Sequence, residues 1–192
     1  MELLKQRILR DGQVKEGGVL KVDSFLNHQM DVTLLNEIGR EFRRRFDGAD
    51  ITKIVTIEAS GIGIACLTAQ YFDVPVVFAK KTKTNNIYSD VYTSTVESYT
   101  HKRSYEIVVS KEFLLPEDRV LIIDDFLAKG SAICALSDLI ESAGAHTVGA
   151  GIVIEKSYQS GARLVRERGI RLESLARIES MSVSDGVKFV AD

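Results

Sequence analysis

Residues 119–132 read RVLIIDDFLAKGSA, an apolar run that ends in two acids and passes into small residues. Such an unbroken apolar run is typical of a strand that is buried on both faces of a parallel sheet. The residues that follow, AICALSDLIESAG at 132–144, bring Ile133, Leu136 and Ile140 onto one face of a helix. The stretch therefore predicts a strand, a short loop and a helix in succession, the unit from which α/β proteins are built.

The loop of this unit, Ala128 to Ala132, has the composition of an anion site. In an open parallel sheet, ligands bind beyond the C-terminal ends of the strands, where loops lead into helix N-termini. Backbone N–H groups at a helix start can surround a phosphate, and Gly130 permits a close approach that a side chain would block. Asp124 and Asp125 stand directly before this loop. The alternative is that the acids only solvate a strand end and the small residues only form a tight turn.

Two other nucleotide-binding patterns fit less well. An apolar strand that ends in two aspartates also occurs in P-loop enzymes, but these require GxxxxGK[ST] upstream. The only glycine-rich strand exit upstream, EASGIGIA at 58–65, has no lysine. A dinucleotide site is disfavoured because its third glycine position is Cys66, and because the next strand ends in Lys80 and Lys81 where an acid would bind a ribose hydroxyl.

The rest of the chain continues the alternation of strands and helices. Further strands are predicted at 53–59, 75–80 and 147–156, and helices at 31–46, 67–72 and 162–168. The first of these helices has Asp31 as its expected N-cap. Between residues 80 and 100 the sequence is polar and rich in hydroxyl groups, which predicts a mobile functional loop or an extended hairpin. The pattern as a whole predicts an α/β fold with a parallel sheet covered on both faces.

Bulk composition limits the class of protein. The chain has 192 residues and is 45% hydrophobic, so one domain with a buried core is expected. Its formal net charge is −2, so no basic field that would attract nucleic acid is expected. The arginines of REFRRRF, at 40–46, are expected to be solvated or salt-bridged on one helix.

No apolar window approaches the roughly 18 residues of a membrane span, and a cytoplasmic location is expected. Cys66 and Cys134 lie in apolar helical stretches and are expected to pack as small reduced hydrophobes.

The segment VLIIDDFLAKGSA closely resembles the phosphoribosyl pyrophosphate signature of the type I phosphoribosyltransferases. The resemblance extends over nearly the whole chain and is closest to the bacterial members that act on xanthine, including IEASGIG at 57–63, GIVIEKSYQSGARLV at 151–165 and LESLARI at 172–178. It implies the type I fold, an α/β architecture in which a five-stranded, mainly parallel sheet is flanked by helices and joined by a small N-terminal hood. Residues 1–192 are then one domain, of which residues 1–36 form the base-binding hood.

The resemblance also implies an activity and its partners. The expected reaction is a pentosyl transfer from phosphoribosyl pyrophosphate to xanthine, giving xanthosine 5′-monophosphate and pyrophosphate in purine salvage. The expected Mg²⁺ is chelated mainly by the substrate and is not held by a protein metal site. The chain is expected to form a homodimer and to bind neither nucleic acid nor a membrane. Two alternatives remain: a hypoxanthine, guanine or adenine phosphoribosyltransferase, and a purine-sensing regulator on the same fold.

Site residues follow from the same resemblance. Asp124 and Asp125 are expected to face the ribose hydroxyls. The remaining positions are Ala128, Lys129, Gly130, Ser131 and Ala132 around the 5-phosphate, Glu58, Ala59, Ser60 and Gly61 at the pyrophosphate, and Leu20, Asn27 and Lys156 at the purine base. A lysine only donates hydrogen bonds, so Lys156 suits the carbonyl of a 6-oxopurine and opposes the amino group of adenine. The alternatives are a snorkelling lysine at a sheet edge for Lys156 and a turn asparagine for Asn27.

The phosphate loop departs from the commoner family pattern. Ser131 is its only hydroxyl residue, so phosphate binding must depend on backbone amides, and Ala128 stands where hypoxanthine-guanine relatives have an aspartate in reach of the base. We hypothesise that xanthine, being more acidic than hypoxanthine or guanine, attacks without a strong enzymic base. Lys80, Lys81 and Lys83 head the polar segment, and one of them is expected to stabilise the departing pyrophosphate; Lys81 is named as the catalytic candidate, with the choice among the three open. The ordinary alternative is a solvated charge run.

Overall fold

The computed structural model describes residues 1–81, 90–98 and 103–191, and within these residues the strands form a two-stranded and an eight-stranded sheet. The strands are β1 (Gln13–Lys15), β2 (Val19–Lys21), β3 (Lys53–Ile57), β4 (Val76–Lys81), β5 (Val91–Ser98), β6 (Arg103–Ser110), β7 (Arg119–Leu127), β8 (His146–Lys156), β9 (Leu172–Ser182) and β10 (Gly186–Phe189). The helices are α1 (Glu2–Asp11), α2 (Val32–Arg45), α3 (Ser60–Ala69), α4 (Ser131–Ser142) and α5 (Gly161–Glu167), with one-turn segments η1 (Asp23–Asn27) and η2 (Lys111–Phe113).

The centre of the larger sheet consists of five parallel strands, in the order β9, β8, β7, β3 and β4. Every residue of β3 is buried, as expected of a strand with helices on both faces. The predicted five-stranded parallel core is therefore confirmed. Three antiparallel strands extend it in the described chain: β10 beyond β9 at one edge, and β6 and β5 beyond β4 at the other.

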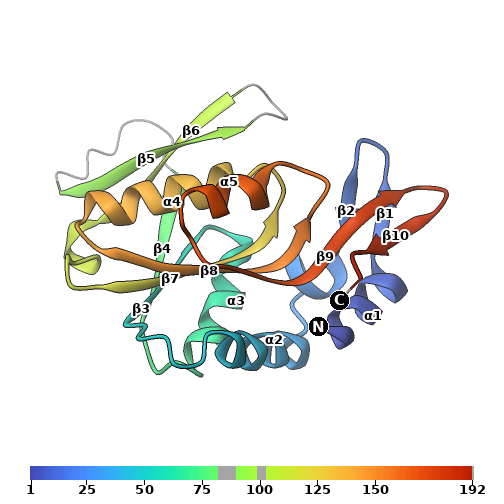
Figure 1. Cartoon of the computed structure of the whole chain (residues 1–192), viewed down its shortest axis with the longest axis horizontal. Helices are drawn as coiled ribbons and strands as arrows, with labels where there is room; N and C mark the ends of the chain where they lie inside the picture. The colour runs from blue at the N-terminus through green and yellow to red at the C-terminus, as the bar shows by residue number, and fades with distance from the viewer. Residues whose placement is uncertain (82–89, 99–102, 192) are drawn as a thin grey trace.

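The polar segment after β4 contains β5, which forms a hairpin with β6, paired in register from Val91 opposite Ser110 to Ser98 opposite Arg103. Of the two predictions for residues 80 to 100, the extended hairpin is therefore confirmed for residues 91–98, and its second strand lies beyond the predicted segment. Residues 82–89 and 99–102, which include Lys83, lie outside the described residues. Figure 1 shows the hairpin lying above α4.

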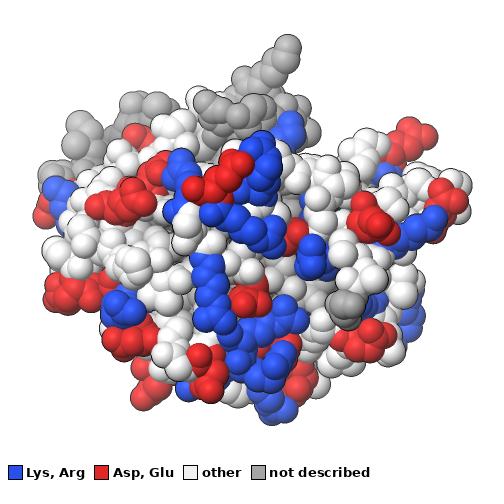
Figure 2. Space-filling view, in the orientation of Figure 1, with Lys and Arg blue, Asp and Glu red and all other residues white. Residues whose placement is uncertain are grey.

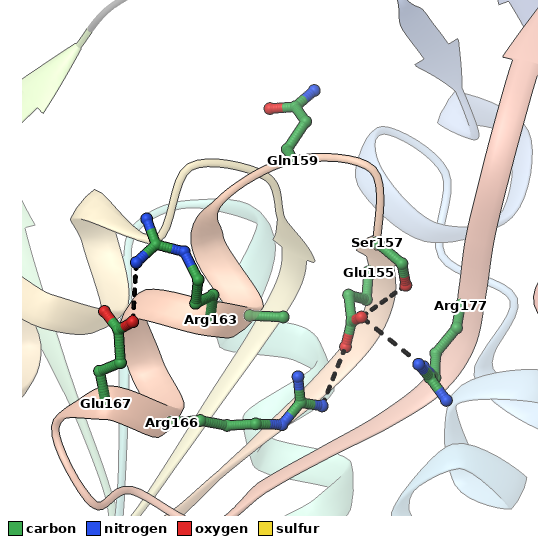
Figure 3. A pocket seen from close by; sticks show the side chains of 8 residues that line it. Glu155, Ser157, Gln159, Arg163, Arg166, Glu167 and Arg177 are labelled. Carbon is green, nitrogen blue, oxygen red and sulfur yellow. Dashed lines mark hydrogen bonds and ion pairs between the residues drawn. The ribbon is translucent and has the colours of Figure 1, made fainter.

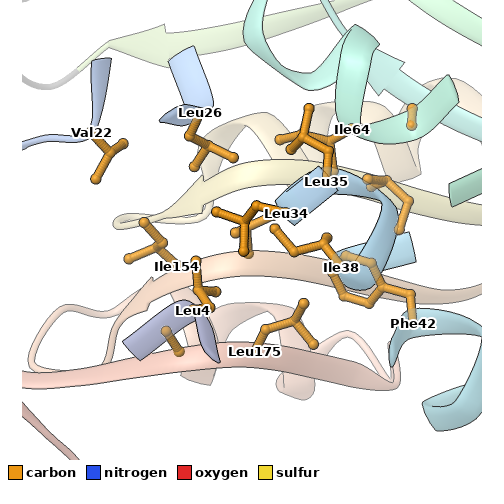
Figure 4. Close-up of a cluster of buried hydrophobic side chains, with 14 of the residues drawn as sticks. Leu4, Val22, Leu26, Leu34, Leu35, Ile38, Phe42, Ile64, Ile154 and Leu175 are labelled. Atoms are coloured by element: carbon orange, nitrogen blue, oxygen red, sulfur yellow. The ribbon is translucent and has the colours of Figure 1, made fainter. Parts of the chain in front are cut away.

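Helices cover both faces of the central sheet. Figure 1 shows α4 and α5 on one face and α2 and α3 on the other. One buried cluster joins α2 to the sheet through residues such as Ile38 and Phe42 (Figure 4), and the other joins α4 to the opposite face of the same strands. The predicted cap of α2 is confirmed, because the Asp31 carboxylate accepts a hydrogen bond from the Leu34 N–H at 3.1 Å.

The N-terminal elements α1, β1, β2 and η1 pack at the end of the molecule where β9 and β10 emerge (Figure 1). Leu4, Ile8 and Phe25 are fully buried in the same cluster as Leu175 of β9. These four elements, from Glu2 to Asn27, are called the hood below, and their part in binding a base stays a prediction. The predicted hood boundary at residue 36 falls inside α2, which packs on α3, and the single-domain assignment stays a prediction.

Three predictions of detail can be compared with the structure. The helix after β3 begins at Ser60 and ends at Ala69, earlier than the predicted 67–72, because the glycines of SGIGIA lie inside it. Cys66 is exposed on this helix, so the expectation that it packs as a buried hydrophobe was wrong, whereas Cys134 is partly buried. None of the described helices is long and apolar enough to cross a membrane.

The arginines of α2 are paired with acids, as predicted. Arg44 and Arg45 both bind Glu41, at 2.8 and 2.9 Å, while Arg40 and Arg43 pair with Glu37 and Asp47 at 3.0 and 2.9 Å. Figure 2 shows acidic and basic side chains interspersed over this side of the molecule. Basic side chains gather along the middle of this face, with acidic ones beside them.

Candidate functional site

The C-terminal end of β7 brings the two predicted aspartates to the edge of the parallel sheet. Asp124 is buried, with 4% of its surface exposed, and Asp125 is half-buried. The backbone N–H of Asp125 donates to the Asp124 carboxylate at 3.0 Å, and that of Phe126 donates to the Asp125 carboxylate at 2.8 Å. These bonds fix both side chains at the strand exit.

Burial raises the pKa of Asp124 well above its ordinary value, and the neighbouring Asp125 charge raises it further. The Lys81 ammonium opposes this rise in the pKa through its positive charge. A buried carboxyl with a raised pKa gains from any cation or hydrogen-bond donor that arrives beside it. The site is therefore arranged to bind a ligand that carries hydroxyl groups or a cation.

The predicted phosphate loop follows β7 and turns into α4. Gly130 adopts φ +86°, a left-handed conformation that only glycine takes readily, and it caps the helix that starts at Ser131. A Cβ on Gly130 would stand 3.1 Å from the Cα of Gly161, so the loop lies against the start of α5. The Gly161 N–H donates to the Ala128 carbonyl at 2.9 Å, which fixes this contact. The amides at the start of α4 are thereby held in one arrangement.

The predicted pyrophosphate segment leaves β3 beside the aspartates. A Cβ on Gly61 would stand 2.0 Å from Thr56 Oγ1 and 3.4 Å from an Asp124 carboxylate oxygen, so only glycine allows the start of α3 to lie this close. The peptide bond between Glu58 and Ala59 is cis. The Glu58 carboxylate accepts a hydrogen bond from the Lys81 N–H at 2.6 Å, which ties the segment to the end of β4.

The β5–β6 hairpin borders the same region. A cavity of 720 Å³ is lined by Thr95 of β5 together with Lys129, Gly130 and Ser131 of the loop. On β6, the Tyr105 ring lies under the Lys81 ammonium, 5.3 Å from its centroid. The predicted lysine thus stands between the hairpin and the aspartates, whereas the Lys80 ammonium lies over the ring of Phe78.

The hood closes the other end of the site. Lys156, the last residue of β8, donates to the Gly18 carbonyl at the β1–β2 turn at 2.8 Å, and its ammonium lies 5.7 Å from the Phe126 ring centroid. Burial lowers the pKa of Lys156. Asn27 Oδ1 is buried and, among the described residues, has no hydrogen-bond partner. Leu20 is buried inside the hood, beside Gly12.

The structure brings the predicted residues of β3, β7 and α4 to one end of the sheet, and joins Lys156 to the hood. Sequence reasoning missed Phe126, Tyr105 and Gly161. A sequence signal for Phe126 exists, because it directly follows the two aspartates and therefore lies at the same C-terminal end of β7. Tyr105 and Gly161 carry no local signal, because their importance comes from contacts with residues distant in the sequence.

The described residues offer no protein cage for a metal. Within residues 1–81, 90–98 and 103–191, no group of three His, Cys, Asp or Glu side chains lies together in a way that could hold an ion. The two aspartates alone provide fewer ligands than Mg²⁺ requires, so a magnesium ion here would need most of its oxygen ligands from a bound molecule and water.

A second cavity, of 470 Å³, lies beyond Lys156 on the α5 side of the sheet (Figure 3). Glu155 points into it with only 1% of its surface exposed, and its carboxylate accepts hydrogen bonds from Ser157 Oγ at 2.5 Å and Ser174 Oγ at 2.6 Å. The Arg166 and Arg177 guanidinium groups stand 3.9 and 3.6 Å from it. This network links the end of β8 to β9 and to the turn before α5.

The chain matches known proteins along most of its length. Residues 21–169 match the family described as the phosphoribosyl transferase domain. The chain is 63% identical over 186 residues to a xanthine phosphoribosyltransferase of Lachnoclostridium phytofermentans, covering 97% of this chain and 96% of that protein. It is 54% identical over 190 residues to a xanthine phosphoribosyltransferase of Clostridioides difficile, covering 98% and 100%.

Solved structures show the same fold. The adenine phosphoribosyltransferase of Giardia lamblia, complexed with 9-deazaadenine, matches with a TM-score of 0.74 and 26% identity, covering 88% of this chain and 92% of that chain. The adenine phosphoribosyltransferase of Leishmania tarentolae matches with a TM-score of 0.74 and 19% identity, covering 91% and 87%. The latter likeness is one of fold alone.

Proposed function

The chain belongs to the phosphoribosyl transferase domain family, and we propose on this premise that it transfers the 5-phosphoribosyl group from phosphoribosyl pyrophosphate to xanthine. The products are xanthosine 5′-monophosphate and pyrophosphate, and the reaction is one of purine salvage. The predicted type I fold is confirmed by the family match and by the shared fold of the solved structures. The enzyme is a pentosyltransferase.

One observation carries the proposal: the buried Asp124 with the half-buried Asp125, the start of α4 capped by Gly130, and Lys156 at the end of β8 lie at one edge of the sheet. We assign the ribose hydroxyls to Asp124 and Asp125, since carboxylates accept hydrogen bonds from both hydroxyls of a ribose. The amides from Ala128 to Ala132 bind the 5-phosphate at the start of α4. The sugar is then held at both ends, and its C1 faces the purine site.

The leaving pyrophosphate lies at the Glu58–Gly61 segment, with Lys81 beside it. As the bond from ribose C1 to pyrophosphate breaks, negative charge grows on the leaving group and positive charge on the ribosyl ring. A cation held at the leaving group stabilises this transition state more than the ground state. The two aspartates face the sugar and favour the positive charge there, and the hairpin excludes water that would hydrolyse it.

The base is read by groups at the end of β8 and in the hood. The Lys156 ammonium can donate to the 6-carbonyl of an oxopurine, while the amino group of adenine would face it with a second donor. The Phe126 ring offers an apolar face near the same ammonium, suited to stacking on a purine. Asn27 Oδ1, which has no hydrogen-bond partner in the part of the chain that the structure describes, can accept from an N–H of the base. These contacts favour 6-oxopurines.

The choice of xanthine rests on the relatives and on the missing side-chain base. Ala128 leaves the loop without a proton acceptor for the purine nitrogen, which suits a base acidic enough to ionise in water. The pH profile of kcat/KM should then follow the ionisation of xanthine itself. A profile that is unaffected when xanthine is replaced by an analogue of different pKa would contradict this step.

Mg²⁺ belongs to this proposal as part of the substrate. Bound to the pyrophosphate and ribose oxygens, it would neutralise charge on the departing group, and Asp124 and Asp125 would orient the chelated ribose. We also propose that the enzyme acts as a homodimer in the cytoplasm.

The decisive experiment measures pyrophosphate release from phosphoribosyl pyrophosphate with xanthine, guanine, hypoxanthine and adenine in separate reactions. We expect kcat/KM for xanthine to exceed that for each other base by roughly tenfold or more. Preference for guanine, hypoxanthine or adenine would assign the chain to a different salvage reaction. No release with any base, together with tight purine binding, would favour the regulator.

A further inference from the structure

Lys81 lies at the junction between the parallel sheet and the β5–β6 hairpin. It is the last residue of β4 and is exposed, and its backbone is held by the Glu58 carboxylate. A lysine has a flexible four-carbon stem, so an exposed ammonium spreads over many positions unless a neighbour confines it. Catalysis by the proposed function requires this charge at one place, beside the leaving group.

The register of the sheet places Tyr105 on the same face as Lys81. Lys81 pairs directly with Ile107 of β6, and Tyr105 is two residues from Ile107 along the same strand. Directly paired residues share a face, and so do residues two apart on one strand. The ammonium therefore reaches the ring without leaving its own face, and it lies 5.3 Å from the ring centroid.

The surroundings favour a strong contact between the two side chains. The Tyr105 ring is partly buried and packs against the cluster beneath α4. Burial raises the pKa of Tyr105, and the Asp124 charge adds to the rise, so the ring is neutral and within electrostatic reach of the catalytic carboxylate. A cation over a partly desolvated aromatic face is attracted more strongly than one over an exposed ring.

We propose that Tyr105 is a positioning residue that holds the Lys81 ammonium at the pyrophosphate end of the site through the face of its ring. The inference rests on the proposed function, because it deepens the role of Lys81 there. Tyr105 itself touches no substrate in this scheme. Since it belongs to the hairpin, the placement of the hairpin determines where the leaving group meets its cation.

The hairpin contains a matched control. The Lys111 ammonium lies 5.6 Å from the centroid of the Tyr92 ring, and Tyr92 packs against the same cluster as Tyr105. Tyr92 lies on β5, opposite Val109, and is separated from β4 and Lys81 by the whole of β6. Tyr92→Leu therefore removes a comparable contact between a hairpin ring and a lysine, here Lys111 at the start of η2, while leaving the Lys81 pair intact.

The experiment measures the Kd of inorganic pyrophosphate with MgCl2 by calorimetry, for the intact chain and a set of variants. We expect Tyr105→Leu to raise this Kd roughly tenfold, and Tyr105→Phe, which keeps the ring, to stay within about twofold. Tyr92→Leu should also stay within about twofold. In the Lys81→Ala background, Tyr105→Leu should have no further effect, because its partner is already gone.

The wild-type protein provides a readout that needs no variant to fold. The ε-methylene protons of Lys81 should resonate upfield of those of other lysines, because they lie over an aromatic ring. The inference would be overturned by an ordinary chemical shift for these protons. It would also be overturned if Tyr92→Leu and Tyr105→Leu lost equal affinity, or if Tyr105→Leu had its full effect in the Lys81→Ala background. None of these measurements includes a purine, so failure of the xanthine assay would leave them standing.

Discussion

At the residue scale, Asp124 shows how a carboxyl that we assign to substrate binding can destabilise the folded state. Its carboxyl is buried, and its pKa is raised by that burial and by Asp125. An acid whose pKa is higher in the folded than in the unfolded state destabilises the fold once it ionises. This destabilisation is absent below its unfolded pKa of about 3.8, grows as pH rises from there to the folded pKa, and is then constant.

Asp124→Asn should therefore stabilise the protein while lowering its activity. We expect the free energy of unfolding at pH 7.5 to rise by about 1 kcal/mol or more, since a charge no longer has to be buried. Turnover should fall roughly a hundredfold, because the ribose loses its acceptor. Urea unfolding at pH 7.5 and pH 4, with turnover at pH 7.5, measures both effects.

Asp125→Asn is the matched variant, since Asp125 is half-buried and adjacent. Asp125→Asn should lower activity, and it should stabilise the protein less than Asp124→Asn does. It removes a like charge from beside Asp124, but the buried Asp124 carboxylate itself stays. If Asp124→Asn destabilised the protein as much at pH 7.5 as at pH 4, the buried carboxylate would not be the unfavourable group that we infer.

The residues that sequence reasoning could place are those that are adjacent in the chain. Asp124, Asp125 and Gly130 lie within seven positions of one another, so a strand followed by a helix start was enough to bring them together. Tyr105 and Phe126 gain their importance from lysines at positions 81 and 156, which belong to other strands. Such contacts require the order and register of the sheet, which one sequence does not supply.

At the scale of elements, the strands that read as apolar runs were predictable, including the partly exposed β4, whereas β9, whose second half is largely exposed, was not. The apolar runs of β3, β7 and β8 indicated strands directly, because every successive side chain is buried in the middle of the sheet. In β9 exposed residues interrupt the second half, so the sequence LESLARIESMS does not by itself predict a strand. The polar residues of β5 suit a loop as well as a strand, so the sequence between residues 80 and 100 predicts either one.

A buried ion pair joins the start of β3 to the loop before β7. The Lys53 ammonium contacts the Asp118 carboxylate at 2.6 Å and donates to the Phe113 carbonyl at 2.8 Å. Asp118 also accepts from the Leu115 N–H at 2.8 Å. Although burial alone would raise the pKa of Asp118, these bonds outweigh it and lower the pKa. The pair fixes the N-terminal ends of two adjacent parallel strands.

Removing one partner should expose the weakness of such a pair. We expect Asp118→Ala to lower the free energy of unfolding by about 3–5 kcal/mol at pH 7, because the Lys53 ammonium stays buried without its counter-ion. Since the folded pKa of Asp118 is lowered, its contribution is present above its unfolded pKa of about 3.8 and is lost as pH falls through the folded value. Urea unfolding at pH 7 and below pH 4 measures this.

The control is Asp50→Ala, which breaks the exposed pair between Asp50 and Arg119, 3.1 Å apart at the same end of the sheet. That change should alter stability by less than about 1 kcal/mol, because solvent screens the pair. Equal effects of the two substitutions would contradict the role given to the buried pair. Because both sites lie at the opposite end of the strands from Asp124, the KM values of the folded variants should be unchanged.

At the scale of the whole molecule, the hood and the sheet share one interior. The cluster in Figure 4 contains Leu4 and Val22 of the hood, Ile38 of α2 and Ile154 and Leu175 of the sheet. The hood therefore has no core of its own, although it supplies residues of the proposed base site. A segment with no separate core unfolds together with the elements that bury it.

Phe25→Ala tests this coupling, because Phe25 is fully buried in the hood. The Arg7 guanidinium lies 5.1 Å from the centroid of the Phe25 ring and also binds Asp31, the N-cap of α2. We expect a loss of about 3–5 kcal/mol in the free energy of unfolding, with a single calorimetric transition whose van't Hoff and calorimetric enthalpies stay equal. Val183→Ala, at an exposed position, should have almost no effect on stability. A first transition in which the hood unfolds while the sheet stays folded would show that the chain divides into two cooperative units. Purine binding could then be lost without loss of pyrophosphate binding.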